Sequence, residues 1–341
     1  MTIKVVSLYC GAGGIDSGFH EAGFQTVFAT DISTLFCSTF KKNFPECETL
    51  STDIRNVNFK TVRKKYISID VLVGGPPCPP FSKSRFYIKS KKRAMNDLDG
   101  KDTIENYFRA VNELKPKIFF FENVHGFVYK PHQESLEYLL KMCEELGYEP
   151  SFKVINTADF GVAQTRERFI CVGVKKNLKK FEFPIATHSK DDVPGCSKWV
   201  TAGEVLNDID FDLEEDAKMI AGSKHKELLK MIPPGDNYLF FTKERGHPNP
   251  IFKWRSRYWS FLLKLSTERP SWTIQASHSN NMGPFHWKNR FLRINEIKRL
   301  QSFKDDYQLN GSYKEQWRQI GNAVPPLLAY VFAKKIKKDY F

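Results

Sequence analysis

The chain has 341 residues, of which 41% are hydrophobic and 27% charged, the composition of an ordinary globular protein of one or two domains. Its formal net charge of +13 favours a polyanionic partner, either nucleic acid or a membrane surface. No apolar run approaches the roughly 20 residues of a membrane span, and the N-terminus lacks a signal-peptide pattern, so we expect an intracellular protein. Seven cysteines without a CxxC pair indicate reduced thiols and argue against a disulfide framework and a metal site.

Alternating predicted strands and helices occupy the first half of the chain. Apolar runs without polar alternation predict strands buried on both faces, and apolar residues at helical spacing predict helices. Strands separated by helices indicate an α/β fold with a doubly wound parallel sheet. The strands are expected at 3–9, 26–30, 70–75, 117–124 and 168–174, and helices at 104–114 and 136–148, with a further helix ending near residue 22.

After about residue 180 this alternation is lost, and acidic and turn-forming stretches such as 207–216 take its place. We therefore expect a second, smaller and irregular domain at 184–305. The segment 325–338 has the apolar spacing of an amphipathic helix with two prolines near its start. The predicted division is 1–183, 184–305 and 306–341, with the last segment returning to the first domain.

Unusual residues follow four of the predicted strands. They are the glycine loop YCGAGG, then Asp31, the segment GGPPC and the segment ENV. In an open parallel sheet, ligands gather beyond the carboxyl ends of the strands. We therefore expect these four elements to converge in one site.

The glycine loop after the first strand is a candidate cofactor site. Gly11 and Gly13 begin a GxG pattern, but Asp16 stands at the third position of the dinucleotide fingerprint. Negative charge in the first helical turn makes a pyrophosphate, and therefore NAD, an unattractive ligand. Asp31 can bind the hydroxyls of a ribose, which favours a nucleoside without phosphate such as S-adenosylmethionine. The alternative is a tight turn capped by Asp16.

Cys78 is the exceptional cysteine, because two prolines precede it and two follow it. Proline fixes φ and removes a backbone donor, so the loop is stiff. Stiffness suits a loop that must present one thiol in one place, as a nucleophile does. The alternative is a structural cysteine buried in a proline turn.

Three charged residues near two strand ends complete the candidate site. Glu122 follows an apolar FFF run, where burial should raise the pKa of its carboxyl group and make it a proton donor near neutral pH. Gln164, Arg166 and Arg168 are spaced two residues apart, so all three side chains should share one face of a strand. Two guanidinium groups there can hold a carboxylate, a phosphate or a carbonyl oxygen. A solvated strand edge is the alternative.

Together these segments resemble the DNA cytosine-5 methyltransferase family. The motifs appear in the family's order over nearly the whole chain, as SLYCGAGGIDSGF, GGPPCPPFS, FFENVHGF, QTRERFICVGV, RINEIKRLQSFKD and QIGNAVPP. The resemblance implies a Rossmann-like S-adenosylmethionine-dependent methyltransferase domain at 1–183. It also implies a target-recognition domain at 184–305 and a C-terminal segment, 306–341, that completes the catalytic domain.

The resemblance also implies a reaction and its residues. Cys78 would attack carbon 6 of a flipped-out cytosine, Glu122 would hold and protonate ring nitrogen 3, and Arg166 would bind the ring carbonyl, with Arg168 beside it. Tyr9 replaces the more usual phenylalanine, and Pro79 stands where many members have glutamine. The implied cofactor residues are Tyr9, Gly11, Gly13, Asp31, Asp53, Ile54, Pro77 and Asn322, with no metal.

Two basic stretches are candidate DNA contacts. The segment 83–93 holds six basic residues in eleven, and 253–264 interleaves Arg255 and Arg257 with aromatic residues. A solvated surface is the alternative for both, and the acidic run 207–216 should face away from DNA. The predicted contact residues are Ser82, Lys83, Arg85, Arg255 and Arg257.

The small size favours a compact bacterial enzyme of a restriction-modification system. We expect a cytoplasmic monomer that acts on double-stranded DNA, with a cognate restriction endonuclease acting separately. A transfer-RNA cytosine-5 methyltransferase is the nearest alternative, although the Cys-Phe-Thr signature of that lineage is absent. A non-catalytic DNA-binding homologue and an NAD-dependent oxidoreductase are the others.

Overall fold

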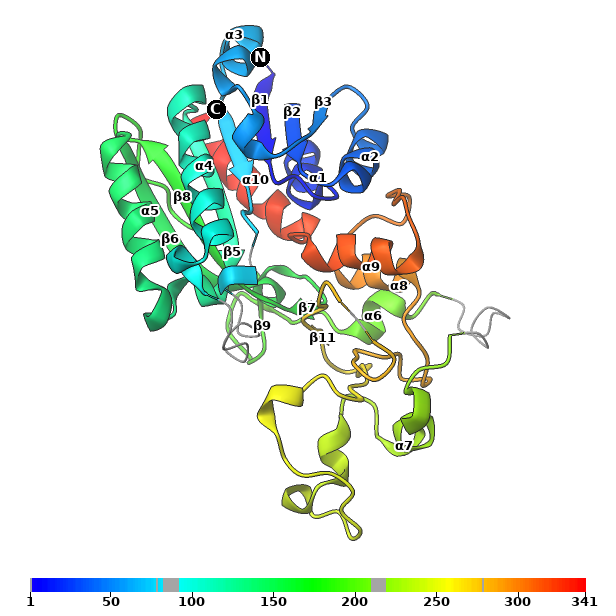
Figure 1. The fold of residues 1–341 in the computed structure, drawn as a ribbon. Helices are drawn as coiled ribbons and strands as arrows, with labels where there is room; N and C mark the ends of the chain where they lie inside the picture. The colour runs from blue at the N-terminus through cyan, green and yellow to red at the C-terminus, as the bar shows by residue number, and fades with distance from the viewer. Residues whose placement is uncertain (1, 78, 82–91, 210–218, 278) are drawn as a thin grey trace.

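A computed structural model of the protein describes residues 2–77, 79–81, 92–209, 219–277 and 279–341. Its central layer is a seven-stranded sheet with the order β3-β2-β1-β4-β5-β8-β6 (Figure 1). The α/β class predicted from the sequence is confirmed, and all five expected strands are present. The strands are β1 (Ile3–Leu8), β2 (Phe24–Asp31), β3 (Glu48–Ser51), β4 (Val71–Gly74), β5 (Ile118–Val124), β6 (Tyr148–Asn156) and β8 (Glu167–Lys175).

The sheet is not wholly parallel, because β8 runs antiparallel to both β5 and β6. The prediction of a parallel sheet was wrong at this strand. Residues 157–166 join β6 to β8 without a crossover α-helix, and neighbours joined by so short a connection pair antiparallel. β3 and β6 were also missed, since three of the four β3 residues are exposed and β6 mixes polar with apolar residues.

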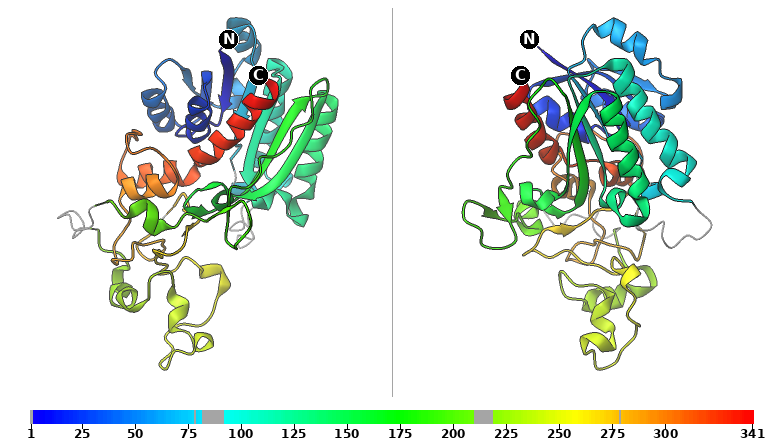
Figure 2. Two further views of the ribbon diagram at one scale, coloured as in Figure 1. Left: turned by 180° about the vertical axis from the view of Figure 1, so that it is seen from behind. Right: turned by 90° about the vertical axis from the view of Figure 1, so that its left-hand side faces the viewer.

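Helices cover both faces of the sheet (Figure 2). α3, α4 and α5 pack on one face, and α1 and α10 pack on the other. α2 lies beside β2 and β3 at one edge. The helices of this part are α1 (Gly14–Glu21), α2 (Thr34–Asn43), α3 (Phe59–Tyr66), α4 (Leu98–Leu114), α5 (Gln133–Glu145) and α10 (Pro326–Tyr340).

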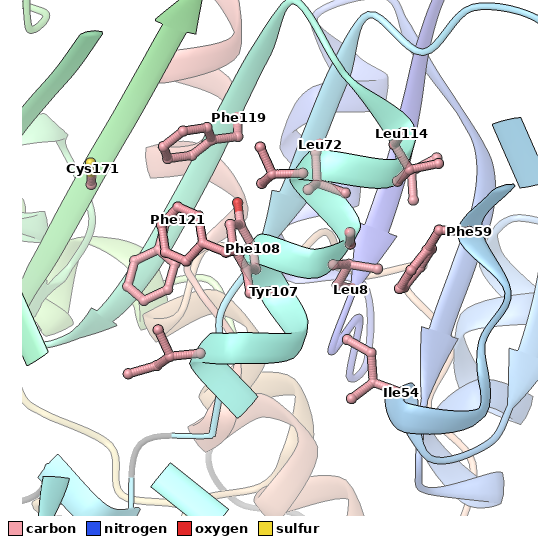
Figure 3. Packing of buried hydrophobic residues seen from close by; sticks show 14 of the residues in the cluster. Leu8, Ile54, Phe59, Leu72, Tyr107, Phe108, Leu114, Phe119, Phe121 and Cys171 are labelled. Atoms are coloured by element: carbon pink, nitrogen blue, oxygen red, sulfur yellow. The ribbon is translucent and has the colours of Figure 1, made fainter. Parts of the chain in front are cut away.

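The larger core cluster lies between the sheet and α4. Leu8, Leu72 and Phe119 from three strands pack against Phe108 and Leu114 of the helix (Figure 3). Each of these side chains is almost fully buried, which contributes about 1.5–3 kcal/mol apiece to folding. The core therefore holds the strand ends in a fixed arrangement.

α10, at the end of the chain, packs closely against α1. A Cβ atom on Gly14 would lie 2.3 Å from the Val324 carbonyl oxygen, and one on Gly18 would lie 2.3 Å from the Pro326 carbonyl oxygen. Glycine is required at both positions because the two backbones approach so closely. The glycines of the first motif therefore hold the start of α10 against α1.

Where the structure describes residues 184–305, they form short helices and strands. The yellow and green segments of this part extend away from the sheet in Figure 1. None of the helices in the described ranges could cross a membrane by length and apolarity. The short helices of this part are α6 (Ala202–Leu206), α7 (Lys226–Met231) and α8 (Ile294–Leu300), and α9 (Tyr313–Asn322) follows them.

Candidate functional site

The carboxyl ends of β2, β1, β4 and β5 lie side by side. Leu8 at the end of β1 pairs with Thr30 of β2 and with Gly74 of β4, and Gly74 pairs in turn with Phe121 of β5. The expected convergence of the four strand ends is therefore confirmed. Asp31 is the last residue of β2 and the ENV segment closes β5, while the glycine loop follows β1 and the GGPP segment continues from the last residue of β4.

Glu122 and Arg168 form an ion pair at the end of β5. Arg168 Nε donates to Glu122 Oε1 at 2.8 Å, and each residue is only 9% exposed. Burial raises the pKa of the Glu122 carboxyl group, although the guanidinium groups of Arg168 and Arg166 oppose that rise. Arg168 Nη1 donates to the Glu167 carbonyl oxygen at 2.7 Å, and Nη2 has no hydrogen-bond partner among the described residues. The pair thus combines a proton donor with free guanidinium N–H groups.

The GGPP segment packs closely against the Glu122 carboxyl group. A Cβ atom on Gly75 would lie 2.7 Å from Glu122 Oε2, so only glycine leaves that oxygen room. Asn123 is fully buried and its Nδ2 donates to the Pro76 carbonyl oxygen at 3.2 Å. Asn123 therefore ties ENV to the proline loop, a role that we missed although the motif contains it. Cys78 itself lies outside the described residues.

Gln164, Arg166 and Arg168 share one buried face, as their spacing predicted, while Thr165 and Glu167 between them are more exposed. Arg166 also binds other segments of the chain. Its Nη1 donates to the carbonyl oxygen of residue 274 at 3.0 Å, and its Nη2 donates to those of 321 and 323 at 2.8 and 3.2 Å. Arg166 therefore joins three segments of the chain, and Arg168 is the arginine beside Glu122.

Asp31 and the glycine loop form the second half of the site. Asp31 Oδ2 accepts from Gly11 N at 3.1 Å, and Oδ1 accepts from Ser33 N at 2.8 Å. Burial raises the pKa of the Asp31 carboxyl group, and these backbone donors oppose that rise. A Cβ atom on Gly11 would meet only the Tyr9 carbonyl oxygen, at 3.9 Å, so there is open space beside the loop. A half-buried carboxylate with acceptor capacity to spare fits the hydroxyls of a ribose.

The other expected cofactor residues surround this position. Tyr9 donates from its hydroxyl to the Thr103 carbonyl oxygen at 2.7 Å, and the Asp53 carboxylate accepts from the side chain and backbone N–H of Arg55. That interaction lowers the pKa of Asp53. Ile54 is buried, and its carbonyl oxygen accepts from Arg109 at 2.6 Å.

Further cofactor candidates lie at two other loops. Gly13 is buried close to the hydroxyl of Tyr307, which donates to the carbonyl oxygen of Ala12. Pro77 is exposed after β4, and Asn322 is exposed at the end of α9.

Two exposed apolar residues beside Asp31 escaped the sequence reasoning. Ile32 is 72% exposed directly after it, and Leu50 is 42% exposed on the neighbouring strand β3. Their signal in the sequence is weak, because exposure of a single isoleucine or leucine follows from the fold alone. Ile32 follows Asp31 directly and Leu50 lies opposite Thr30, so the two residues offer an apolar surface near the Asp31 carboxylate.

Asp16 lies elsewhere than expected. It neither caps α1 nor faces a ligand, because its carboxylate is fully buried under the sheet. Ser7 Oγ and Thr26 Oγ1 donate to it at 2.9 and 2.8 Å, and burial raises its pKa to about 6. We argued against NAD because Asp16 would place a negative charge at the start of this helix. The buried position of Asp16 does not support that argument.

The predicted DNA contacts fall in two places. Ser82, Lys83 and Arg85 lie outside the described residues, as does most of the acidic run 207–216. Arg255 and Arg257 are exposed. No group of three or more metal-ligating side chains occurs within the ranges described.

Known proteins resemble this chain along almost its whole length. A family model described as C-5 cytosine-specific DNA methylase matches residues 3–338. The Type II methyltransferase M.SacI of Streptomyces achromogenes is 36% identical over 369 residues, covering 99% of this chain and 93% of the relative. M.NgoFVII of Neisseria gonorrhoeae, also a Type II methyltransferase, is 33% identical over 335 residues, covering 98% and 86%.

Solved structures agree on the fold. A candidate DNA modification methyltransferase encoded within an E. coli prophage superimposes with a TM-score of 0.73 at 20% sequence identity, covering 99% of each chain. At that identity the likeness concerns the fold alone.

Proposed function

Because the chain belongs to the family of C-5 cytosine-specific DNA methylases, we propose that it methylates a flipped-out cytosine through a covalent bond to Cys78. It is a DNA cytosine-5 methyltransferase of the restriction-modification type. The observation that carries the proposal is the buried pair of Glu122 and Arg168 at the end of β5. That pair lies among the strand ends that also carry Asp31 and the proline loop.

The proposed reaction uses three side chains. The thiolate of Cys78 bonds to carbon 6 of the cytosine, and Glu122 transfers a proton to ring nitrogen 3 as electron density moves to carbon 5. Arg168 binds the ring carbonyl through its Nη2, the role that the resemblance implied for Arg166. After carbon 5 is methylated, a base removes its proton. The carbon–sulfur bond then breaks, Cys78 leaves as a thiolate, and nitrogen 3 returns its proton to Glu122.

We propose S-adenosylmethionine as the methyl donor, which supplies an electrophilic methyl group when it is bound. Asp31 would accept hydrogen bonds from its ribose hydroxyls, and Gly11 keeps the neighbouring space open. Ile32 and Leu50 would pack against the adenine, with Asp53 at its edge. The remaining expected contacts are Tyr9, Gly13, Ile54, Pro77 and Asn322.

The proposed DNA substrate is a duplex with a specific recognition sequence. Residues 184–305 would recognise the target, and 1–183 together with 306–341 would perform catalysis. Arg255 and Arg257 are exposed on the recognition part and can neutralise phosphates. The predicted contacts Ser82, Lys83 and Arg85 remain part of the proposal. We also propose that the protein acts as a monomer in the bacterial cytoplasm, separately from a cognate endonuclease.

Methyl incorporation from radiolabelled S-adenosylmethionine tests the proposal directly. Duplex DNA should be labelled and total transfer RNA should not, and bisulfite sequencing of DNA from an expressing host should reveal the modified sequence. Cys78→Ser should abolish labelling and retain cofactor binding. Label in transfer RNA alone would instead support the transfer-RNA alternative, and full activity of Cys78→Ser would refute the covalent mechanism.

A further inference from the structure

Two tryptophans, Trp259 and Trp272, lie together beside β7 (Gln164–Thr165), the short strand that precedes β8. Trp272 belongs to β11 (Ser271–Trp272), which pairs in parallel with β7 (Figure 1). Its ring is 49% exposed and lies 5.6 Å from that of Trp259, centroid to centroid. The two rings together therefore present an aromatic surface that is partly open to solvent.

The position of this pair follows from the register of the strands. Trp272 pairs with Thr165, three residues before Arg168, and an extended chain rises about 3.3 Å per residue. Thr165 is therefore about 10 Å along the chain from Arg168, but the two side chains point to opposite faces, so Trp272 lies on the face away from the pair of Arg168 and Glu122.

Several hydrogen bonds hold the pair in place. Thr273 Oγ1 donates to the Thr165 carbonyl oxygen at 2.8 Å, which fixes the chain after Trp272. Asn237 Nδ2 donates to the Trp259 carbonyl oxygen at 2.7 Å. Rings that are already ordered lose little conformational entropy when a ligand packs on them.

The surroundings of the pair are cationic. Arg257 lies two residues before Trp259, and its Nη2 donates to the Tyr258 hydroxyl at 2.7 Å. Its guanidinium carbon lies 4.6 Å from the centroid of the Tyr258 ring. The backbone of Arg255 exchanges two hydrogen bonds with the Tyr238 hydroxyl, and its side chain is exposed. Aromatic faces beside arginines match the bases and phosphates of nucleic acid.

We propose that Trp259 and Trp272 form an aromatic platform that packs against the sugar and base of a nucleotide outside the catalytic site, in the same DNA as the extruded cytosine. This inference rests on the proposed function for the identity of the extruded base. The platform positions the DNA strand and does not touch the reacting atoms. The partner that we propose for the platform is duplex DNA. The alternative is that the two tryptophans bind another protein.

The test compares Trp272→Ala, Trp272→Phe and the wild type with unmethylated genomic DNA as substrate and competitor. Phe152→Ala is the control, because Phe152 is a 42% exposed aromatic residue on the edge strand β6. Trp272→Ala should raise the KM and Kd for DNA about tenfold or more, since stacking one base contributes roughly 1–3 kcal/mol. The KM for S-adenosylmethionine and the melting temperature should not change, and Trp272→Phe should recover most of the affinity.

Unchanged DNA affinity in Trp272→Ala would overturn the platform, as would an equal loss in Phe152→Ala or no recovery in Trp272→Phe. Binding of DNA is measured independently of methyl transfer. A wild-type protein that binds DNA but methylates nothing would therefore refute the proposed function, while the binding comparison would still decide the role of Trp272.

Discussion

Arg168 donates from Nε to Glu122 Oε1 at 2.8 Å while the second carboxylate oxygen of Glu122 faces Gly75. The arginine opposes the rise in the Glu122 pKa that burial causes, so the carboxyl group keeps a raised pKa without being locked in its neutral form. One oxygen is held and the other is directed at the loop before Cys78. The pair can therefore orient a proton as well as supply it.

Glu122→Gln should lower kcat for DNA methylation by about 100-fold to 10,000-fold, because an amide can donate a hydrogen bond but cannot transfer the proton. In the wild type, proton donation should decline as pH rises through the raised pKa of Glu122. A pH profile of single-turnover methyl transfer measures both effects.

Glu167→Gln is the matched control, because Glu167 is exposed and accepts from His125 at 2.9 Å, away from the buried face. It should retain near wild-type activity. A similar loss of activity in both variants would contradict the assignment to Glu122.

Substitutions of Arg168 and Arg166 should have different effects, the first on activity and the second on stability. Arg168→Lys should lower kcat about 100-fold with little change in melting temperature, because lysine can pair with Glu122 but lacks the guanidinium fork. Arg166→Lys should mainly destabilise the fold, by about 3 kcal/mol, since it strands several buried carbonyl oxygens. Thermal melting and methyl incorporation, measured on both variants, separate these effects. A loss of activity in Arg166→Lys without destabilisation would instead return the ring-carbonyl role to Arg166.

Gly75→Ala should lower activity because the added methyl group would collide with the Glu122 carboxylate, and not because it strains the backbone. The added Cβ would lie 2.7 Å from Glu122 Oε2, so either the carboxylate or the proline loop must move. We expect a fall in kcat of about 100-fold, with the Kd for S-adenosylmethionine within about twofold of wild type, because a displacement of about 1 Å misaligns the reacting groups. Isothermal titration with the cofactor and single-turnover kinetics test this pair of outcomes. Weakened cofactor binding with normal chemistry would contradict it.

The sequence identified the strand ends because their pattern is local. Runs such as 117–124 are apolar on both faces, and the residues that follow them break the pattern abruptly. The direction of β8 was not predictable in this way, since an apolar run reads alike in a parallel or an antiparallel strand. β3 was missed because an exposed edge strand carries almost no apolar signal.

Within the site, spacing placed Arg166 and Arg168 on one face but did not assign their partners. The partners of Arg166 come from residues 274, 321 and 323, which are more than 100 positions away in the chain. Contacts over such separations depend on the tertiary fold. Asp16 differs, because its partners Ser7 and Thr26 are only 9 and 10 positions away, and they become its neighbours only when α1 packs on β1 and β2.

Asp16 provides a test of the fold that is independent of catalysis. Its pKa is raised from 3.8 to about 6 in the folded protein, so the folded state binds its proton more tightly than the unfolded state does. The stability from this group is fully present below about pH 4 and is lost as pH rises through about 6. Asp16→Asn should therefore gain free energy of unfolding relative to wild type between pH 4 and 8, by up to about 3 kcal/mol. Asp305→Asn should differ from wild type by a constant amount over this range, because Arg299 lowers the pKa of Asp305 and the group is ionised in both the folded and the unfolded state above pH 4. Urea unfolding of the three proteins across this pH range measures the difference, and a constant difference between Asp16→Asn and wild type would show that Asp16 is not protonated on folding.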